Sequence, residues 1–174
     1  DRATLDVAIT FERLPQAEVI VVPDPIGGFY RPSNGARPAE FAAANMGSHA
    51  TYSMPTLTYH ETIPCHHLQI ALASELDLPL LRRIEGFLGF TEGWALYAER
   101  LAWELGWYDN DPFGNLGRLS DEMMRAVRLV VDTGIHAMGW TADQAANYFV
   151  ANTGKPLSYA RYQIQRYVVW PGQS

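Results

Sequence analysis

Apolar and polar positions follow two different patterns along the chain, one up to about residue 55 and one beyond it. In the first part, short runs of β-forming residues alternate with turns rich in proline and glycine, which predicts strands over 5–11, 18–22, 28–30 and 39–45. Within the second of these runs, residues 19–22 are continuously apolar and are followed by Pro23, which is typical of a buried strand.

Beyond residue 55, apolar residues recur at helical spacing. We predict helices over 56–75, 78–88, 90–105, 116–138, 142–151 and 158–167. The fifth ends at a strong stop signal, because Gly154 follows the periodic region and Pro156 lies just beyond it. The pattern predicts a predominantly α-helical α+β domain, with a small β-rich segment over 1–55 and a helical core over 56–174.

Composition limits the classes of partner. Of the 174 residues, 48% are hydrophobic and 12% aromatic, which is typical of a packed globular protein. A net charge of −6, with a pI near 5.3, disfavours nucleic acid and anionic membranes as partners. We expect no membrane span, because no apolar run approaches the roughly 18 residues that one needs. The single cysteine excludes an internal disulfide and leaves the compartment open, and the oligomeric state is not readable.

Residues 60–67 read His-Glu-Thr-Ile-Pro-Cys-His-His and gather three of the five histidines beside a carboxylate. Two neutral imidazoles and a base for an attacking water are what a catalytic zinc site requires. The usual motif is H-E-x-x-H, in which a spacing of four places both histidines on one helix face. Here Pro64 occupies the position of the second histidine, so that motif is absent as written.

The separation of His60 and His66 decides whether both can bind one metal. On an unbroken helix they would point about 240° apart and lie roughly 9 Å apart along the axis. Zinc ligands must each come within about 2.1 Å of the ion, so an unbroken helix excludes the site, and His67 would also lie too far away. Pro64 removes a backbone donor and clashes with the carbonyl four residues back. A kink or bulge at Pro64 and Cys65 can therefore return His66 toward His60; a histidine-rich helix break without metal is the alternative.

The next helix carries two carboxylates, Glu92 and Glu99, seven positions apart and hence on one face. A carboxylate on a buried face needs a metal, an arginine or a histidine as its partner. Glu92 follows His66 by 26 residues, enough for a helix, a turn and a returning helix, so it is the candidate third ligand. The alternatives are a solvated Glu92 and, for Glu99, a salt bridge to Arg100 or Arg82.

A polar stripe marks the helix predicted over 116–138. Arg128, Asp132 and His136 are each four positions apart and share one face. Asp132 can pair with Arg128 and hold His136 in one tautomer, so that His136 binds substrate or stabilises an oxyanion. A structural ladder of salt bridges along the helix is the alternative.

The last predicted helix carries Tyr159, Tyr162, Arg166 and Tyr167. A tyrosine hydroxyl, that of Tyr159 for example, can stabilise a tetrahedral oxyanion, and Arg166 can hold a substrate carboxylate through two bonds. The alternative is that aromatic residues at this spacing belong to the core. His49, in a predicted loop, is expected at the surface or as a supporting neighbour of the site.

Four segments, in order, resemble the bacterial family catalogued as domain of unknown function 885, which is grouped with zincin-type metallopeptidases. The segments are 60–69, 91–99, 128–136 and 170–173, and the resemblance runs from about residue 18 to the end. It implies a zincin-like helical catalytic core, a zinc cofactor and a peptide substrate, with an edge strand of the β-rich segment lining the cleft. Because family members are longer on both sides, it also implies that this chain is a fragment.

The resemblance assigns roles to individual residues. It implies that His60, His66 and Glu92 bind the metal and that Glu61 is the general base. It favours His66 over His67 as the second ligand histidine. From the chemistry of their own side chains, His136 and Tyr159 are further residues expected to act catalytically. Those expected to support the ligands or contact substrate are His67, Glu99, Arg128, Asp132 and Arg166.

One position departs from the family pattern, because Cys65 stands where the family has glycine. A positive φ at this position would strain a cysteine. The thiol beside the ligands could touch the metal or be sensitive to oxidation, although free cysteine usually behaves as a small hydrophobe. Two functions remain: a zinc-dependent peptidase, or a catalytically inactive or metal-free relative that binds peptides.

Overall fold

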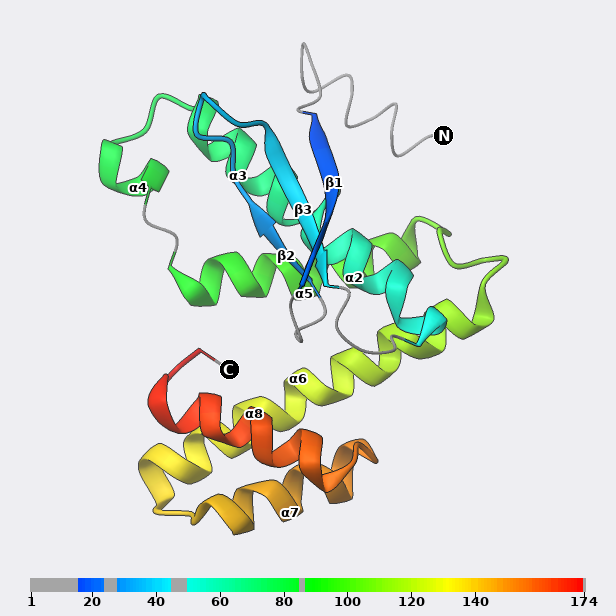
Figure 1. Cartoon of the computed structure of the whole chain (residues 1–174), viewed down its shortest axis with the longest axis vertical. Coiled ribbons are helices and arrows are strands. Elements are labelled where there is room, and N and C mark those ends of the chain that lie inside the picture. The colour runs from blue at the N-terminus through cyan, green and yellow to red at the C-terminus, as the bar shows by residue number, and fades with distance from the viewer. Residues whose placement is uncertain (1–15, 24–27, 45–49, 85–86, 174) are drawn as a thin grey trace. The chain divides into compact units, whose positions relative to one another are not determined.

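The computed structural model describes residues 16–23, 28–44, 50–84 and 87–173 (Figure 1). The chain forms two compact units, Asp1–Gly117 and Arg118–Ser174. Helices dominate and accompany one small sheet, which confirms the predominantly α-helical α+β class. Within the described ranges, none of the helices has both the length and the apolar character that crossing a membrane would take.

The first unit contains a sheet of three strands, β1 (Ala17–Val22), β2 (Gly28–Arg31) and β3 (Ala39–Ala44). β3 is central, parallel to β1 and antiparallel to β2. The strands predicted over 18–22 and 28–30 are confirmed, as is that over 39–45 up to residue 44. Residue 45, the strand predicted over 5–11 and His49 lie outside the described residues.

The expectation that the apolar run over 19–22 is buried is wrong. β1 lies at one edge of the sheet, and Val19 and Val21 are 68% and 67% exposed. β-Branched residues suit any extended, pleated segment and do not distinguish a central strand from an edge strand. The central strand is instead the alanine-rich β3, in which Ala42 is fully buried and Phe41 nearly so.

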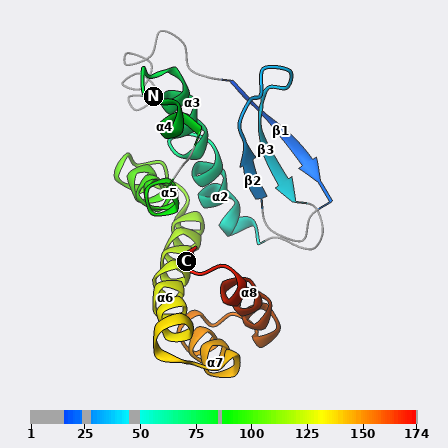
Figure 2. The ribbon, with the colours of Figure 1, turned by 90° about the vertical axis from the view of Figure 1, so that its left-hand side faces the viewer.

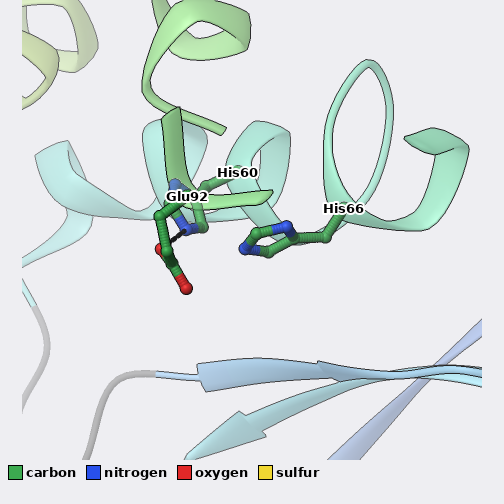
Figure 3. A group of neighbouring side chains, drawn as sticks. All are labelled: His60, His66 and Glu92. Atoms are coloured by element: carbon green, nitrogen blue, oxygen red, sulfur yellow. Dashed lines mark ion pairs between the residues drawn. The ribbon is translucent and has the colours of Figure 1, made fainter. Parts of the chain in front are cut away.

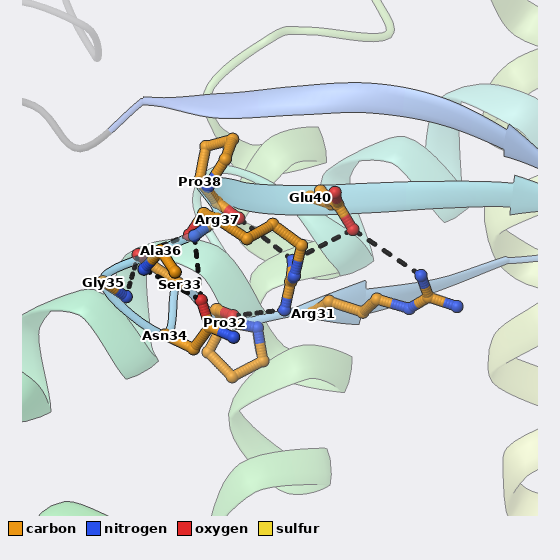
Figure 4. A network of polar contacts seen from close by, with 9 residues as sticks. All are labelled: Arg31, Pro32, Ser33, Asn34, Gly35, Ala36, Arg37, Pro38 and Glu40. Carbon is orange, nitrogen blue, oxygen red and sulfur yellow. Dashed lines mark hydrogen bonds and ion pairs between the residues drawn. The ribbon is translucent and has the colours of Figure 1, made fainter.

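A polar network holds the turn between β2 and β3 (Figure 4). Arg37 forms an ion pair of 2.9 Å with Glu40 and donates a second bond, of 2.9 Å, to the carbonyl of Pro32. Glu40 also lies 3.6 Å from Arg31 on β2, directly opposite it in the strand register. The side chain of Asn34 accepts a bond of 2.8 Å from the backbone N–H of Arg37. These contacts connect the ends of both strands, so β2 is held firmly on β3.

The helical part of the first unit lies along one face of the sheet, as Figures 1 and 2 show for α2 and α3. Its elements are a short 3-10 helix η1 (Thr51–Ser53), α2 (Met54–Glu61), α3 (His66–Glu75), α4 (Leu80–Ile84) and α5 (Leu88–Glu104). α2 packs against both β2 and α5, and α3 packs against α4 and α5. α5 therefore lies beside the two helices that carry the histidines.

The prediction of one helix over 56–75 is wrong, because the chain leaves the helix between Thr62 and Cys65. Both residues have non-helical backbone angles, with φ and ψ of −112° and −116° at Thr62 and −105° and −123° at Cys65. The Ile63–Pro64 peptide bond is cis. Pro64 cannot donate a helical bond, and its ring disfavours helical geometry in the residue before it. The break therefore starts before the proline and is longer than the expected kink at Pro64 and Cys65.

The second unit is built around the long helix α6 (Pro112–Met138), which begins in the first unit, together with α7 (Ala142–Thr153) and α8 (Leu157–Val169). α7 packs against α8. Side chains from the three helices form one buried core. Its members are Val127, Val131, Ala145, Ala146, Phe149, Ala160, Ile164 and Tyr167.

The ends of these helices follow local signals in the sequence. α7 begins at Thr141 with a capping box and ends at Gly154, whose φ of 66° is the left-handed conformation expected there. α6 begins four residues earlier than predicted, at Pro112. The side chain of Asp111 accepts a bond of 2.8 Å from the backbone N–H of Gly114. An aspartate cap followed by proline is a helix start signal, so the earlier start was readable from the sequence.

Candidate metal centre

The break between α2 and α3 brings His60, His66 and Glu92 together (Figure 3). His60 is in the last turn of α2, His66 is the first residue of α3, and Glu92 lies near the start of α5. One possible ligand atom from each of the three lies within 4.8 Å of the other two. The three predicted metal ligands thus converge from three helices.

The distances within this group suit a single zinc ion. His60 Nε2 lies 3.8 Å from Glu92 Oε2, and the rings of His60 and His66 stand edge to face with centroids 4.7 Å apart. Ligand atoms around a tetrahedral zinc lie about 3.4 Å apart, given bond lengths of about 2.1 Å. Small side-chain rotations would therefore suffice, and two imidazoles with one carboxylate are an established donor set for catalytic zinc. These residues fit the metal.

The group is buried on one side and open on the other. His60 and His66 are buried, whereas the side chain of Glu92 is 41% exposed. In Figure 3 the carboxylate of Glu92 extends from α5 toward the strands. A catalytic zinc site keeps one coordination position free for water or substrate, and a half-exposed third ligand leaves room for that position.

Glu99 provides the partner that His60 needs. Its Oε1 lies 2.6 Å from His60 Nδ1, and the residue is 1% exposed. When Nδ1 donates its hydrogen to this carboxylate, His60 Nε2 presents its lone pair on the side of Glu92. Of the alternatives drawn from the sequence, the histidine partner is the one observed here, while the neighbouring Arg100 donates to Glu104 over 3.1 Å.

Glu61, the predicted general base, borders the same group. It is the last residue of α2 and is 6% exposed. Its Oε1 lies 4.0 Å from His60 Nε2, the nitrogen that faces Glu92. A water between these groups would lie within reach of the Glu61 carboxylate, which is the position that a general base requires.

His67 points to a different partner from that of His66. It is 2% exposed, and its Nδ1 lies 3.0 Å from the hydroxyl of Tyr30 on β2. The group of three candidate ligands contains His66 and not His67. Burial raises the pKa of Tyr30, an effect partly offset by the positive charge of Arg37. Tyr30 was not among the predicted site residues, because no helical spacing connects a residue on a strand to a helix that follows it.

Cys65 is buried beside the ligands rather than strained. Its φ is −105°, so the strain expected from a positive φ does not arise. It is fully buried against Ala95, Ala98 and Trp94. Burial, and then the negative charge of Glu61, raise the pKa of its thiol. The side chain therefore acts as a small hydrophobe that fills the space between the break and α5.

The polar stripe on α6 contacts the turn at residues 170–173. Arg128 donates to the side-chain oxygen of Gln173 over 2.8 Å and to its carbonyl over 3.3 Å. The carboxylate of Asp132 accepts a bond of 2.9 Å from the backbone N–H of Gly172. His136 Nε2 lies 3.8 Å from that carboxylate. These contacts support a structural role for Arg128 and Asp132.

The remaining predicted site residues also have partners within the second unit. His136 Nε2 lies 2.9 Å from the carbonyl oxygen of Tyr167, and the Arg166 guanidinium lies 5.4 Å from the centre of the Tyr167 ring. The Tyr159 hydroxyl donates to the sulfur of Met124 over 3.6 Å, and burial raises the pKa of this tyrosine. The three ligands belong to the first unit, so roles for His136, Tyr159 and Arg166 at the metal centre stay predictions.

Residues 9–174 match the family model described as bacterial protein of unknown function, DUF885. The chain belongs to this family. The match covers the three residues of the candidate metal centre and, apart from residues 1–8, both compact units. No match was found among curated proteins.

Two solved structures are similar to this DUF885 chain. One, described as "the putative lipoprotein from Colwellia psychrerythraea", has a TM-score of 0.89 and 44% identity, over 99% of this chain and 32% of that one. The other, from Shewanella oneidensis and described as a "putative lipoprotein of unknown function", has a TM-score of 0.72 and 17% identity, over 99% and 34%. The second likeness concerns the fold alone. The chain spans about a third of the length of both structures.

Proposed function

We propose that this chain carries the metal centre of a zinc-dependent peptidase. The observation that carries the proposal is the convergence of His60, His66 and Glu92 within 4.8 Å, beside the buried carboxylate of Glu61. A third ligand that arrives from a neighbouring helix, here α5, is also the layout expected of a zincin-like core. Zinc held by two imidazoles and a carboxylate supplies Lewis acidity, which polarises a carbonyl and makes water more acidic.

The residues of the chain would divide the work of hydrolysis. Glu61 takes a proton from the attacking water and passes it to the leaving nitrogen as the C–N bond breaks. The water oxygen ends in the new carboxylate, so the products are a free acid and a free amine. Glu99 keeps His60 Nδ1 occupied through the 2.6 Å contact, which holds the ligand in one tautomer and one orientation.

Strand β2 is the proposed binding edge for an extended peptide. Within the described residues it pairs with β3 on one side only, and it packs against α2, the helix that carries His60 and Glu61. An exposed strand edge offers backbone groups that can pair with a peptide in the extended conformation. Main-chain pairing of this kind favours peptides as the substrate class, while leaving side-chain preference to the surroundings of the metal.

Two experiments test the proposal: one measures the zinc bound to the chain, and the other tests whether Glu61 is the general base. Elemental analysis of the purified chain after mild dialysis should give about one zinc per molecule. Glu61→Gln, made in the full-length protein, should keep the zinc and lose peptide hydrolysis, because an amide retains the shape of the side chain but cannot take a proton. Glu104→Gln is the matched control, since Glu104 is exposed and pairs with Arg100.

The outcomes separate the two candidate functions. A chain that contains no zinc and takes up none when it is added would remove the proposal. Hydrolysis that survives Glu61→Gln would remove the role of Glu61 as base. Zinc binding without hydrolysis by the full-length protein, on any peptide library, would favour the inactive peptide-binding relative instead.

A further inference from the structure

The first turn of α3, which carries His66, is held from two sides. On one side, the indole nitrogen of Trp94 on α5 donates to the carbonyl oxygen of Pro64 over 3.1 Å. On the other side, the hydroxyl of Tyr30 on β2 lies 3.0 Å from Nδ1 of His67. The residues contacted stand two positions before His66 and one position after it, so the ligand lies between two external contacts.

His66 needs contacts from outside its own helix, because it is the first residue of α3 and directly follows the break at residues 62–65. Within the break, the backbone N–H of Cys65 donates to the carbonyl of Thr62 over 3.0 Å, but no ladder of helical hydrogen bonds fixes the backbone angles there, so tertiary contacts help to set them. A metal site tolerates errors of only about 0.5 Å in the placement of a ligand. The packing of Cys65 against Ala95, Ala98 and Trp94 resists movement of the break, but apolar packing does not set the orientation of the backbone. Hydrogen bonds are directional and can set the orientation.

Both partners are themselves held in relation to the other ligands. Trp94 stands two residues after the ligand Glu92 on α5, so its bond to Pro64 links two ligand-bearing segments directly. Tyr30 stands on β2, which packs against α2, the helix of the ligand His60. The network of Arg31 and its partners in Figure 4 holds the end of β2 next to Tyr30. The bond of Trp94 therefore connects the helix of Glu92 to the segment that carries His66. The bond of Tyr30 connects that segment to β2, which packs against the helix of His60.

We infer that Tyr30 and Trp94 are positioning residues for the ligand His66, and that they set the affinity of the centre for its metal. The inference rests on the proposed function only in that it requires the centre to bind a divalent metal. It does not require the chain to hydrolyse peptides. Neither residue is assigned a contact with substrate.

The variants Tyr30→Phe and Trp94→Phe remove the two bonds and keep an aromatic ring in place. Zinc affinity is measured by competition with a chromophoric chelator, and the visible absorption of the cobalt(II)-loaded chain reports ligand geometry. Removing a group that supports a metal ligand typically lowers affinity by about ten- to a hundredfold, so we expect a loss on the order of tenfold for each variant. The cobalt bands should shift in both.

Tyr59→Phe is the matched control for a general effect of removing a hydroxyl near the site. Tyr59 stands directly before the ligand His60, and its ring packs against those of Trp107 and Tyr108 with centroids 5.0 and 5.5 Å away. This variant should keep both the zinc affinity and the cobalt spectrum. Thermal unfolding of the metal-free proteins checks that the variants fold, and Tyr30→Phe decides the matter if Trp94→Phe does not fold.

The possible results separate this inference from the proposed function. If the unmodified chain binds zinc and Tyr30→Phe binds it as tightly as Tyr59→Phe, with the same cobalt spectrum, the positioning role is overturned and the metal centre stands. If the unmodified chain binds neither zinc nor cobalt, the proposed metal centre fails and the positioning role fails with it. A tenfold loss that appears only in the Tyr30 and Trp94 variants supports the role, whether or not peptides are cleaved.

Discussion

Replacing Glu99 by glutamine tests the link between the buried carboxylate and His60, a proposed metal ligand. The two side chains meet at 2.6 Å, and Glu99 is 1% exposed, so water cannot take the place of the lost charge. Glutamine has nearly the same shape but can present either its oxygen or its amino group to His60 Nδ1. When the amino group donates to Nδ1, the proton of His60 resides on Nε2, and that nitrogen cannot bind a metal.

The expected free-energy cost of Glu99→Gln differs between metal binding and folding. Substituting a carboxylate that supports a metal-binding histidine costs about ten- to a hundredfold in affinity, or about 1.4–2.7 kcal/mol of binding free energy. For the metal-free chain, a charge-assisted bond worth about 1.5–3 kcal/mol is replaced by a neutral one worth about 1 kcal/mol. That loss is opposed by the lower desolvation cost of a buried neutral group. We therefore expect a large fall in zinc affinity with little change in the free energy of unfolding without metal.

Chelator competition measures the affinity, and urea denaturation in the presence of excess chelator measures the metal-free stability. Glu104→Gln is the control, because Glu104 lies on the same helix, is 44% exposed and pairs with Arg100 rather than with a ligand. Zinc affinity of Glu99→Gln equal to that of the control would refute the reasoning. A loss of stability without metal that matches the loss of affinity would show that Glu99 acts through folding and not through His60.

His66, Asp132 and Cys65 each have an expected behaviour that can be measured. His66→Ala should abolish stoichiometric zinc binding and His67→Ala should only weaken it, because the candidate ligand group contains His66. Elemental analysis measures the zinc content of both variants, and the reverse order would show that His67 is the ligand. Asp132→Ala should lower the free energy of unfolding by about 1–3 kcal/mol at unchanged zinc content, because the N–H of Gly172 loses its acceptor. Urea denaturation measures this change, and a midpoint equal to that of the unmodified chain would contradict the prediction. Cys65 should react with iodoacetamide far more slowly in the folded chain than in the urea-unfolded chain, because the thiol is buried and burial raises its pKa. Equal reaction rates in the two states would contradict this prediction.

Residues close in sequence determined much of the helical architecture. The stop at Gly154 depends on a glycine that adopts φ of 66° and on the proline that follows, both of which act locally. The periodic spacing of apolar residues predicted all three helices of the second unit, since a helix needs only its own residues to form its backbone bonds. Spacing also placed Glu92 and Glu99 on one face of α5, where they flank His60.

The tertiary structure decided how those local elements meet. Pro64 indicated a break, but the contacts that hold the break against α5, through Trp94 and Cys65, depend on how the helices pack. The edge position of β1 depends on strand order, which the residues of one strand do not encode. Tyr30 reaches His67 only because the sheet lies beside α2 and α3. Contacts between residues far apart in sequence depend on how whole elements pack, and helical or strand periodicity describes only one element at a time.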